Sequence, residues 1–338
     1  MSFRPADSRL FFTKNDKNDP RVGEIAKPVG PFTSGADLGK ALRAGPRAPT
    51  SFVLAGYPDD EGIRINGGRL GASQAPDCVR KPLYKMTPPL FPSRDILQAG
   101  SLFDLGNLGV DQLPLEKRHE TVSEYALAAL EAGSNWISIG GGHDYGFPDA
   151  TAFIQWCEKT QKNVRPLVIN FDAHLDVRPT SRDGGTETGF SSGTPFFRML
   201  EKHPNVDFAE IGIQNHCNSR QHLTYVKSKG ARVVTQEECL ASGTSLTVQV
   251  TRVLDDWLLR RRPVFLSVDI DGFSSAVAPG CSQSWATGFM PQDFFPLFDL
   301  LVARLDVKAL GIYEVSPPLD QDDRTAKLAA QIIYRVIS

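Results

Sequence analysis

The chain has 338 residues, of which 41% are hydrophobic and 22% are charged, a composition typical of globular proteins. Lysine and arginine number 37 against 39 acidic residues, so the formal net charge is −2 and nothing indicates a nucleic-acid partner. No run approaches 18 consecutive apolar residues, so we expect neither a membrane span nor a membrane partner.

Residues 1–48 are rich in proline, glycine and charge, and we predict an irregular N-terminal extension there with one short helix. The start of the chain lacks an apolar segment and carries charges of both signs, which is not typical of a secretory signal. We therefore expect a cytoplasmic protein. The five cysteines are scattered without a Cys-X-X-Cys pair, which favours free thiols over a disulfide framework or a zinc site.

A rhythm of short apolar runs begins after this extension. These predicted strands cover residues 51–57, 135–140, 166–171, 208–213, 231–235, 263–268 and 307–315. Helical patterns lie between several of them, at residues 121–133, 245–262, 291–305 and 322–337. The alternation predicts an α/β fold with a mainly parallel sheet, and the apolar strands indicate a sheet that is buried on both faces. No linker divides residues 49–338, so we predict one domain.

Three of these apolar runs end in groups that could bind metal. The run at 135–140 leads into Gly-Gly-His, the run at 166–171 into Asp-Ala-His-Leu-Asp, and the run at 263–268 into Asp-Ile-Asp. The carboxyl ends of parallel strands are where ligand sites of α/β proteins collect. The candidate metal ligands are His143, Asp172, His174, Asp176, Asp269 and Asp271.

The spacing of these ligands favours two metal ions over one. Residues two apart on an extended chain point to the same side, so each group can face one centre. Four carboxylates and two imidazoles exceed the needs of a single zinc ion and suit two divalent ions that share carboxylates. The oxygen-rich set favours manganese. Each motif alone is also compatible with a strand-end loop or a helix cap, but the three together favour the metal site.

The three motifs resemble the signature motifs of the ureohydrolase family, which comprises arginases, agmatinases and formiminoglutamases. The resemblance extends from about residue 50 to the C-terminus and includes residues 66–80 and 313–320. It implies a three-layer α/β/α, arginase-like catalytic domain with two Mn²⁺ ions per subunit. One ion would be held by His143, Asp172, Asp176 and Asp269, and the other by His174, Asp172, Asp269 and Asp271.

The resemblance also implies catalytic roles for two residues. Asp176 is similar to the family residue that contacts a metal-bridging hydroxide and relays its proton to the leaving nitrogen. Glu314 is placed to attract the cationic nitrogens of an amidine substrate. Read without the family, Glu314 is also compatible with a helix cap or a solvated strand end.

The choice of substrate depends on Arg178, two residues after the last carboxylate of its motif. A guanidinium beside two metal ions is useful if the substrate carries a carboxylate that it can bind bidentately. Pairing of Arg178 with a neighbouring carboxylate is the structural alternative. The pattern resembles formiminoglutamases, as does the following loop, where Ser191, Ser192 and Arg182 are further candidate substrate contacts.

We therefore expect a manganese-dependent formimidoylglutamase that converts N-formimino-L-glutamate to L-glutamate and formamide in histidine degradation. The alternatives are hydrolysis of another guanidino acid or of agmatine, and a metal-free pseudoenzyme. Agmatine lacks a carboxylate, so Arg178 argues against it. We also expect a small-molecule substrate and a possible homo-oligomeric assembly.

Overall fold

The computed structural model describes residues 3–90, 97–110, 113–180 and 189–338. Its strands are β1 (Phe3–Arg4), β2 (Lys27–Pro28), β3 (Phe52–Gly56), β4 (Leu102–Leu108), β5 (Asn135–Ile139), β6 (Leu167–Phe171), β7 (Asp207–Ile213), β8 (Arg232–Thr235), β9 (Pro263–Asp269) and β10 (Asp306–Tyr313). Its helices are α1 (Val22–Ile25), α2 (Gly35–Ala44), α3 (Glu61–Ile65), α4 (Ala75–Leu83), α5 (Leu115–Glu131), α6 (Gly146–Thr160), α7 (Pro195–Lys202), α8 (Arg220–Ser228), α9 (Gln236–Ser242), α10 (Leu246–Val253), α11 (Pro291–Arg304) and α12 (Arg324–Ile337).

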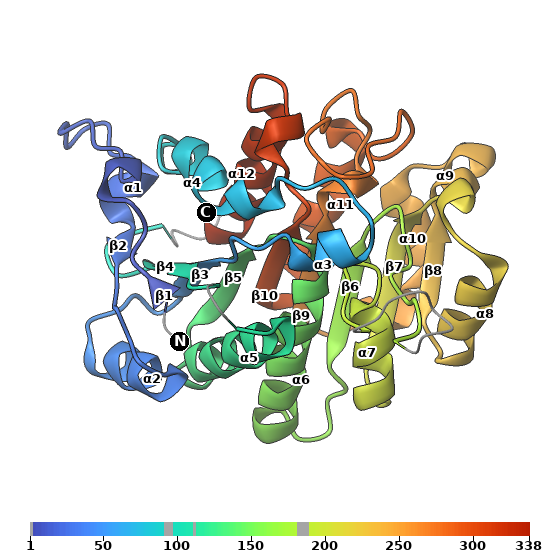
Figure 1. Ribbon diagram of the computed structural model, residues 1–338, viewed down its shortest axis with the longest axis horizontal. Coiled ribbons are helices and arrows are strands. Elements are labelled where there is room, and N and C mark those ends of the chain that lie inside the picture. The colour runs from blue at the N-terminus through green and yellow to red at the C-terminus, as the bar shows by residue number, and fades with distance from the viewer. Residues whose placement is uncertain (1–2, 91–96, 111–112, 181–188) are drawn as a thin grey trace.

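All the strands belong to one sheet (Figure 1), with the order β1-β4-β3-β5-β10-β9-β6-β7-β8 and with β2 paired to β4. Among the described residues every pairing is parallel except that of β1 with β4. The central strands β3, β6 and β9 are buried along their whole length, which explains why they read as continuous apolar runs.

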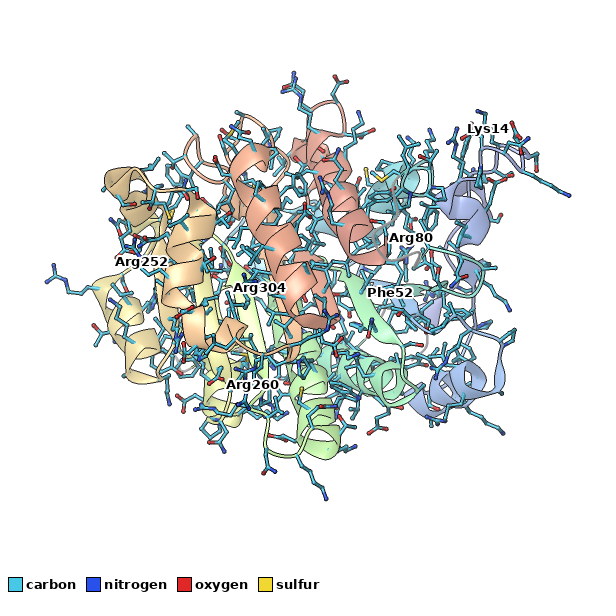
Figure 2. The ribbon with its side chains drawn as sticks, turned by 180° about the vertical axis from the view of Figure 1, so that it is seen from behind. Lys14, Phe52, Arg80, Arg252, Arg260 and Arg304 are labelled. Atoms are coloured by element: carbon cyan, nitrogen blue, oxygen red, sulfur yellow. The ribbon has the colours of Figure 1, made fainter. Side chains whose placement is uncertain are left out.

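Helices cover both faces of the sheet and form two separate hydrophobic cores. Helices α5, α6 and α7 lie on the face turned to the viewer in Figure 1, where Val122, Phe153 and Phe196 belong to one core. Figure 2 shows the opposite face, where α10, α11 and α12 cross the sheet. Val250 and Leu301 belong to the core on that side. The predicted three-layer α/β/α fold with a mainly parallel sheet is confirmed. No helix in the described part of the chain is long and apolar enough to cross a membrane.

Residues 3–48, the described part of the predicted extension, are more regular than the sequence predicts. Strands β1 and β2 add to the sheet through β4, and α2 packs against α5. Leu38 and Leu42, one helical turn apart in α2, are buried in the same core as α5. These elements are too short to give a periodic signal in the sequence, and their stability comes from packing on the larger domain. The division between an extension at 1–48 and a domain at 49–338 stays a prediction.

The helix predicted at 245–262 is wrong in its length. Helix α10 ends at Val253 and a 3₁₀ helix follows at Asp255–Leu258. The guanidinium of Arg232 on β8 donates to the carbonyl oxygen of Val253 at 2.8 Å. It also pairs with Asp256 and lies 3.8 Å from the Trp257 ring. These contacts hold the chain at the C-terminal end of α10. The apolar periodicity of the sequence alone could not reveal where the helix ends.

Candidate metal centre and substrate cavity

Candidate site residues follow four strands that are neighbours in the sheet, in the order β5, β10, β9 and β6. His143 follows β5, Glu314 follows β10, Asp269 ends β9, and Asp172 follows β6. Because these strands are parallel, their carboxyl ends meet at one edge of the sheet. The sheet thus brings together residues that are far apart in the chain.

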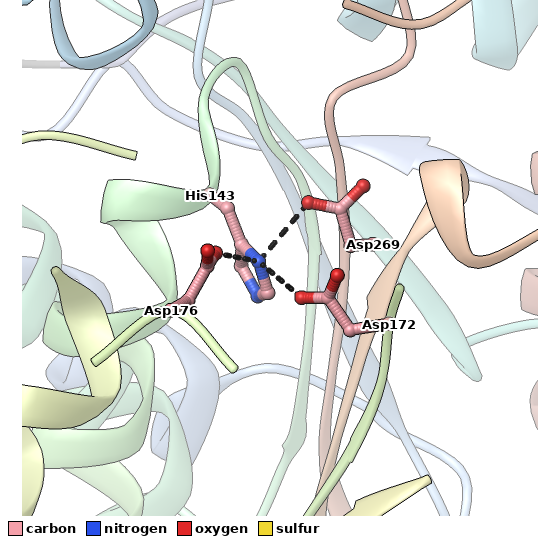
Figure 3. A group of neighbouring side chains, drawn as sticks. All are labelled: His143, Asp172, Asp176 and Asp269. Carbon is pink, nitrogen blue, oxygen red and sulfur yellow. Dashed lines mark ion pairs between the residues drawn. The ribbon is translucent and has the colours of Figure 1, made fainter. Parts of the chain in front are cut away.

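The first cluster surrounds the imidazole of His143 (Figure 3). Its Nδ1 lies 3.2 Å from Asp172 Oδ2, 2.9 Å from Asp176 Oδ2 and 3.1 Å from Asp269 Oδ2. The ligand atoms of these residues lie within 4.8 Å of one another, a group that could hold one metal ion. The sequence predicts this set of four as one ligand group, and the structure places the four side chains together.

The ring of His143 is held in place from several sides. Its Nε2 lies 2.9 Å from Ser267 Oγ, and its face stacks on Tyr313 with ring centroids 4.9 Å apart. The Phe196 ring lies nearly perpendicular to it with ring centroids 5.3 Å apart, and the backbone N–H of His143 donates to Glu314 Oε1 at 3.0 Å. With Nε2 against Ser267, Nδ1 is left to face the carboxylates. Such support of a candidate ligand from outside fixes the ring before any ion binds.

The second cluster adjoins the first through Asp172. His174 Nδ1 lies 3.1 Å from Asp271 Oδ2 and 3.5 Å from Asp172 Oδ1, so Asp172 directs one oxygen at each histidine. Asp172, His174 and Asp271 form the second group that could hold an ion. Asp269 Oδ1 accepts a hydrogen bond from the backbone N–H of Asp271 at 2.9 Å. The sharing of Asp269 by both ions stays a prediction.

The chemistry of these residues fits divalent cations. The carboxylate oxygens 2.9–3.2 Å from the buried His143 Nδ1 are not placed for a hydrogen bond to it, and the buried Asp271 Oδ1 has no hydrogen-bond partner among the described residues. Burial lowers the pKa of His143, but the three carboxylates around it outweigh burial and raise the pKa well above its usual value. Burial, together with the charges of Asp271 and Asp172, raises the pKa of Asp269 well above its usual value. Cations would relieve this crowding of buried carboxylates.

Two of the candidate catalytic carboxylates have strained backbones. Asp176 has a φ of +47° and Glu314 a φ of +64°, both in the left-handed region that favours glycine. Such a conformation costs of order 1 kcal/mol and persists where the surroundings impose it, often at functional sites. Glu314 is buried, which raises its pKa well above the usual value, and it lines the cavity described next. The strain therefore lies at the predicted catalytic residues.

A cavity of about 410 Å³ opens beside both clusters. Asp176, Glu314, Arg178 and Ser192 line it, in agreement with the roles that the sequence predicts for them. Ser191 is fully buried and is not among the lining residues, so the structure does not support a substrate contact by Ser191. The predicted contact at residue 182 (Arg182) lies outside the described residues.

The cavity wall also includes residues that sequence reasoning did not assign to the site, among them Asn66, His222 and Trp285. Asn66 belongs to the segment at 66–80, whose family resemblance is visible in the sequence although it assigns no role to any residue there. His222 on α8 and Trp285 in the loop before α11 stand in no motif. Only the three-dimensional arrangement could reveal them.

The chain is similar to proteins of known family along most of its length. The model of the Arginase family matches residues 50–338. The formimidoylglutamase of Clostridium tetani is 31% identical over 290 residues, which cover 85% of this chain and 82% of that protein. A crystal structure of formimidoylglutamase from Bacillus subtilis has a TM-score of 0.78 at 22% identity, covering 96% of this chain and 93% of the other. Trypanosoma cruzi formiminoglutamase with Mn²⁺ has a TM-score of 0.74 at 26% identity, covering 94% and 97%.

Proposed function

The chain belongs to the arginase family, and from this premise we propose that it is a formimidoylglutamase, which hydrolyses N-formimino-L-glutamate to L-glutamate and formamide. Relatives of that name, 29–31% identical over most of the chain, support the proposal. A small-molecule substrate is consistent with the cavity of about 410 Å³ beside the clusters. A cytoplasmic location and a homo-oligomeric assembly stay predictions of the sequence.

The observation that carries the choice of substrate is the environment of Arg178. Among the described residues, no carboxylate lies within ion-pair distance of its guanidinium, whose hydrogen-bond partner is the neutral side chain of Asn66 at 3.1 Å. The alternative that Arg178 is a structural ion pair therefore finds no support in the described part of the chain. A cation that lines the cavity beside the metal centre favours a substrate with a carboxylate and disfavours agmatine.

The cofactor that we propose is a pair of Mn²⁺ ions, as in the Trypanosoma cruzi protein, whose structure was solved with Mn²⁺. His143, Asp172, Asp176 and Asp269 would hold one ion, and His174 and Asp271 would hold the other together with shared carboxylates. When bound, such ions activate a water molecule near neutral pH and stabilise negative charge that develops during hydrolysis.

The residues of the chain supply binding and proton transfer. We propose that Glu314 attracts the formimino nitrogens, because it is a buried acidic group on the cavity wall. Asp176 belongs to the first cluster and lines the cavity, so we propose that it takes a proton from the attacking water and holds it until the carbon–nitrogen bond breaks. Water adds to the formimino carbon, the bond to the glutamate nitrogen breaks, and Asp176 passes the proton to that nitrogen. Arg178 and Ser192 would bind a substrate carboxylate.

A substrate panel tests the proposal. Enzyme reconstituted with manganese is assayed on N-formimino-L-glutamate, L-arginine, agmatine and 4-guanidinobutyrate, with release of glutamate or urea as the readout. We expect the highest kcat/KM for formiminoglutamate. A preference for agmatine or arginine would contradict the proposal.

Replacement of Arg178 tests the basis of that specificity. Arg178→Ala should lose about 2 kcal/mol, roughly 30-fold in kcat/KM, the low end for a charged contact because the side chain is exposed. Arg178→Lys should recover only part of the loss, since an ammonium cannot form the bidentate fork. The loss should be smaller for formimino-4-aminobutyrate or formimino-2-aminobutyrate, each of which lacks one carboxylate. An equal loss on all three substrates would make Arg178 a structural residue.

A further inference from the structure

The turn at residues 66–69 forms part of the cavity wall, although it contributes nothing to the metal clusters. Helix α3 ends at Ile65, and the chain reverses at Gly67, which has a φ of +77°. The N–H of Gly68 donates to the carbonyl oxygen of Ile63 at 2.9 Å, which closes the turn. The half-buried side chain of Asn66 is thereby placed on the cavity, between Arg178 and Ser192.

We propose that Asn66 is a positioning residue that directs two hydrogen-bond donors, the Arg178 guanidinium and the Ser192 hydroxyl, at a carboxylate of the substrate. The inference rests on the proposed function, since it names the group that orients the carboxylate contacts. It also identifies the ligand chemistry that the turn serves, which is an amidine compound with at least one carboxylate.

The direction of the hydrogen bonds follows from what each group can do. A guanidinium has only donors, so the atom of Asn66 that lies 3.1 Å from Arg178 Nη1 must be the amide oxygen. The Asn66 amide nitrogen then faces Ser192 Oγ, also at 3.1 Å, and donates to it. Ser192 Oγ accepts this bond and keeps its own proton for another partner. No described residue accepts that proton, and Ser192 lines the cavity.

The backbone holds the three side chains close to one another. The N–H of Arg178 donates to the carbonyl oxygen of Gly193 at 2.9 Å, and the N–H of Ser192 donates to that of Gly62 on α3 at 3.1 Å. A Cβ atom at Gly193 would lie 2.9 Å from Arg178 Cδ and 3.2 Å from Asn66 Oδ1. Glycine at 193 therefore lets Arg178 and Asn66 lie side by side over the loop. The arrangement is a built unit that joins α3 to the loop before α7.

The neutrality of Asn66 is as important as its geometry. An aspartate at 66 would accept from Arg178 equally well, but its charge would neutralise the guanidinium and repel a substrate carboxylate. It would also lack a donor for Ser192, whose hydroxyl would then donate to residue 66 instead of the substrate. Asn66→Asp therefore keeps the shape of the side chain and the contact with Arg178, but it neutralises the guanidinium and turns the Ser192 hydroxyl away from the substrate.

The experiment compares Asn66→Asp, Asn66→Ala and Arg178→Ala, and combines Asn66→Ala with Arg178→Ala. The control is Arg64→Ala, an exposed residue of α3 that pairs with Glu61. The readouts are kcat and KM for formiminoglutamate and the Kd of L-glutamate by calorimetry, with the manganese content checked for each variant.

We expect Asn66→Ala to raise KM about tenfold with kcat lowered less than about threefold, and Asn66→Asp to lower kcat/KM by a larger factor. In the Arg178→Ala background, Asn66→Ala should cost less than about threefold, because the part of its effect that passes through Arg178 is already lost and only the part through Ser192 remains. The control should match the wild type, and all variants should keep their metal. If Asn66→Ala does not fold, the isosteric Asn66→Asp decides alone. Asn66→Asp within about twofold of the wild type, or an Asn66→Ala loss that is undiminished without Arg178, would overturn the inference.

The proposed function is judged separately, by turnover of formiminoglutamate in the wild type. If the wild type prefers a guanidino acid such as 4-guanidinobutyrate, the proposed function fails, and the same ratios measured on that carboxylate decide the role of Asn66. If the wild type turns over nothing in the panel, the Kd values for L-glutamate decide it. A wild type that acts only on agmatine and does not bind L-glutamate overturns both.

Discussion

Asp172 occupies the position where the two clusters meet. One of its oxygens lies 3.2 Å from His143 Nδ1 and the other 3.5 Å from His174 Nδ1, and the residue is fully buried. Without this carboxylate, each histidine would lose a neighbouring carboxylate. Each of the two proposed ions would then be held by fewer ligands. A single substitution here should therefore disturb both ions.

We expect Asp172→Ala to weaken Mn²⁺ binding by more than roughly 100-fold, the upper range for residues that only support a ligand. Elemental analysis after reconstitution and gel filtration measures the manganese content per chain. Asp255→Ala, on the 3₁₀ helix after α10, is the control and should keep the wild-type content. Two ions per chain in Asp172→Ala would show that the binuclear arrangement is wrong.

His203, at the end of α7, makes the free energy of unfolding depend on pH. The side chain is 8% exposed and its Nε2 has no hydrogen-bond partner among the described residues. Burial, together with the charge of Lys202, lowers the pKa of His203 to about 4 from a usual 6.5. Between these values the unfolded chain binds a proton that the folded chain does not, so the free energy of unfolding falls as the pH drops through this window.

His203→Gln should therefore lose less stability than the wild type between pH 7 and pH 5. Urea unfolding at the two pH values measures the difference. The exposed His216 supplies the control, and His216→Gln should follow the wild type. An unchanged pH dependence in His203→Gln would mean that His203 is protonated alike in both states.

At the scale of elements, Asp149 of α6 joins the helix to three strands of the sheet. Its carboxylate accepts from Tyr57 at 2.7 Å, Trp136 at 3.0 Å, Ser138 at 2.6 Å and Tyr313 at 2.6 Å. These donors stand on or directly after β3, β5 and β10. Because the ring of Tyr313 stacks on His143, the same carboxylate also supports the metal centre from behind.

We expect Asp149→Leu to destabilise the fold by at least about 3 kcal/mol, since several buried donors lose their acceptor at about 1–3 kcal/mol each. Asp149→Asn keeps an acceptor on one side and should cost less. Ser138→Ala removes one donor and leaves the others satisfied, so it should cost about 1 kcal/mol. Urea unfolding measures all three. A loss under about 1 kcal/mol in Asp149→Leu would mean that the donors find other acceptors.

The strands that the sequence predicts correctly are mostly apolar runs, although β7 and β10 also contain charged residues. All seven predicted strands are present, as β3 and β5 to β10. Strand β4 was missed because it contains Asp104, whose carboxylate bonds the fully buried Arg80 at 2.9 Å. Tyr84 donates to the same carboxylate. A strand that buries an ion pair reads as polar, and its partner 24 residues earlier is invisible to a local pattern.

In the molecule as a whole, the gathering of the candidate metal ligands could be predicted from the sequence, whereas the wall of the cavity could be predicted only in part. Each predicted ligand lies at or just after the end of an apolar strand. A parallel sheet brings these strand ends to one edge, whatever the conformation of the connecting loops. No comparable rule predicts which residues form the wall of the cavity. Asn66 and Arg178 are 112 residues apart, and their contact depends on how α3 and two loops pack together. Such contacts come from tertiary structure, which one sequence does not reveal.

Ions bound at the two candidate clusters should stabilise the folded chain. The two clusters connect the ends of β5, β6 and β9, which belong to the middle of the sheet between its two hydrophobic cores. An ion that binds only the folded chain stabilises it by about 2.7 kcal/mol at 100 times its Kd. Manganese should therefore raise Tm by a few degrees over the chelated protein, and the rise should grow with manganese concentration.

Differential scanning calorimetry with EDTA and with increasing manganese measures this shift. Asp172→Ala is the matched control, because its Tm should respond little to manganese if the ions act through the clusters. An equal shift in the wild type and in Asp172→Ala would place the stabilising ion elsewhere on the molecule. No shift in the wild type would contradict metal binding by the folded chain, since binding to the native state alone must raise Tm.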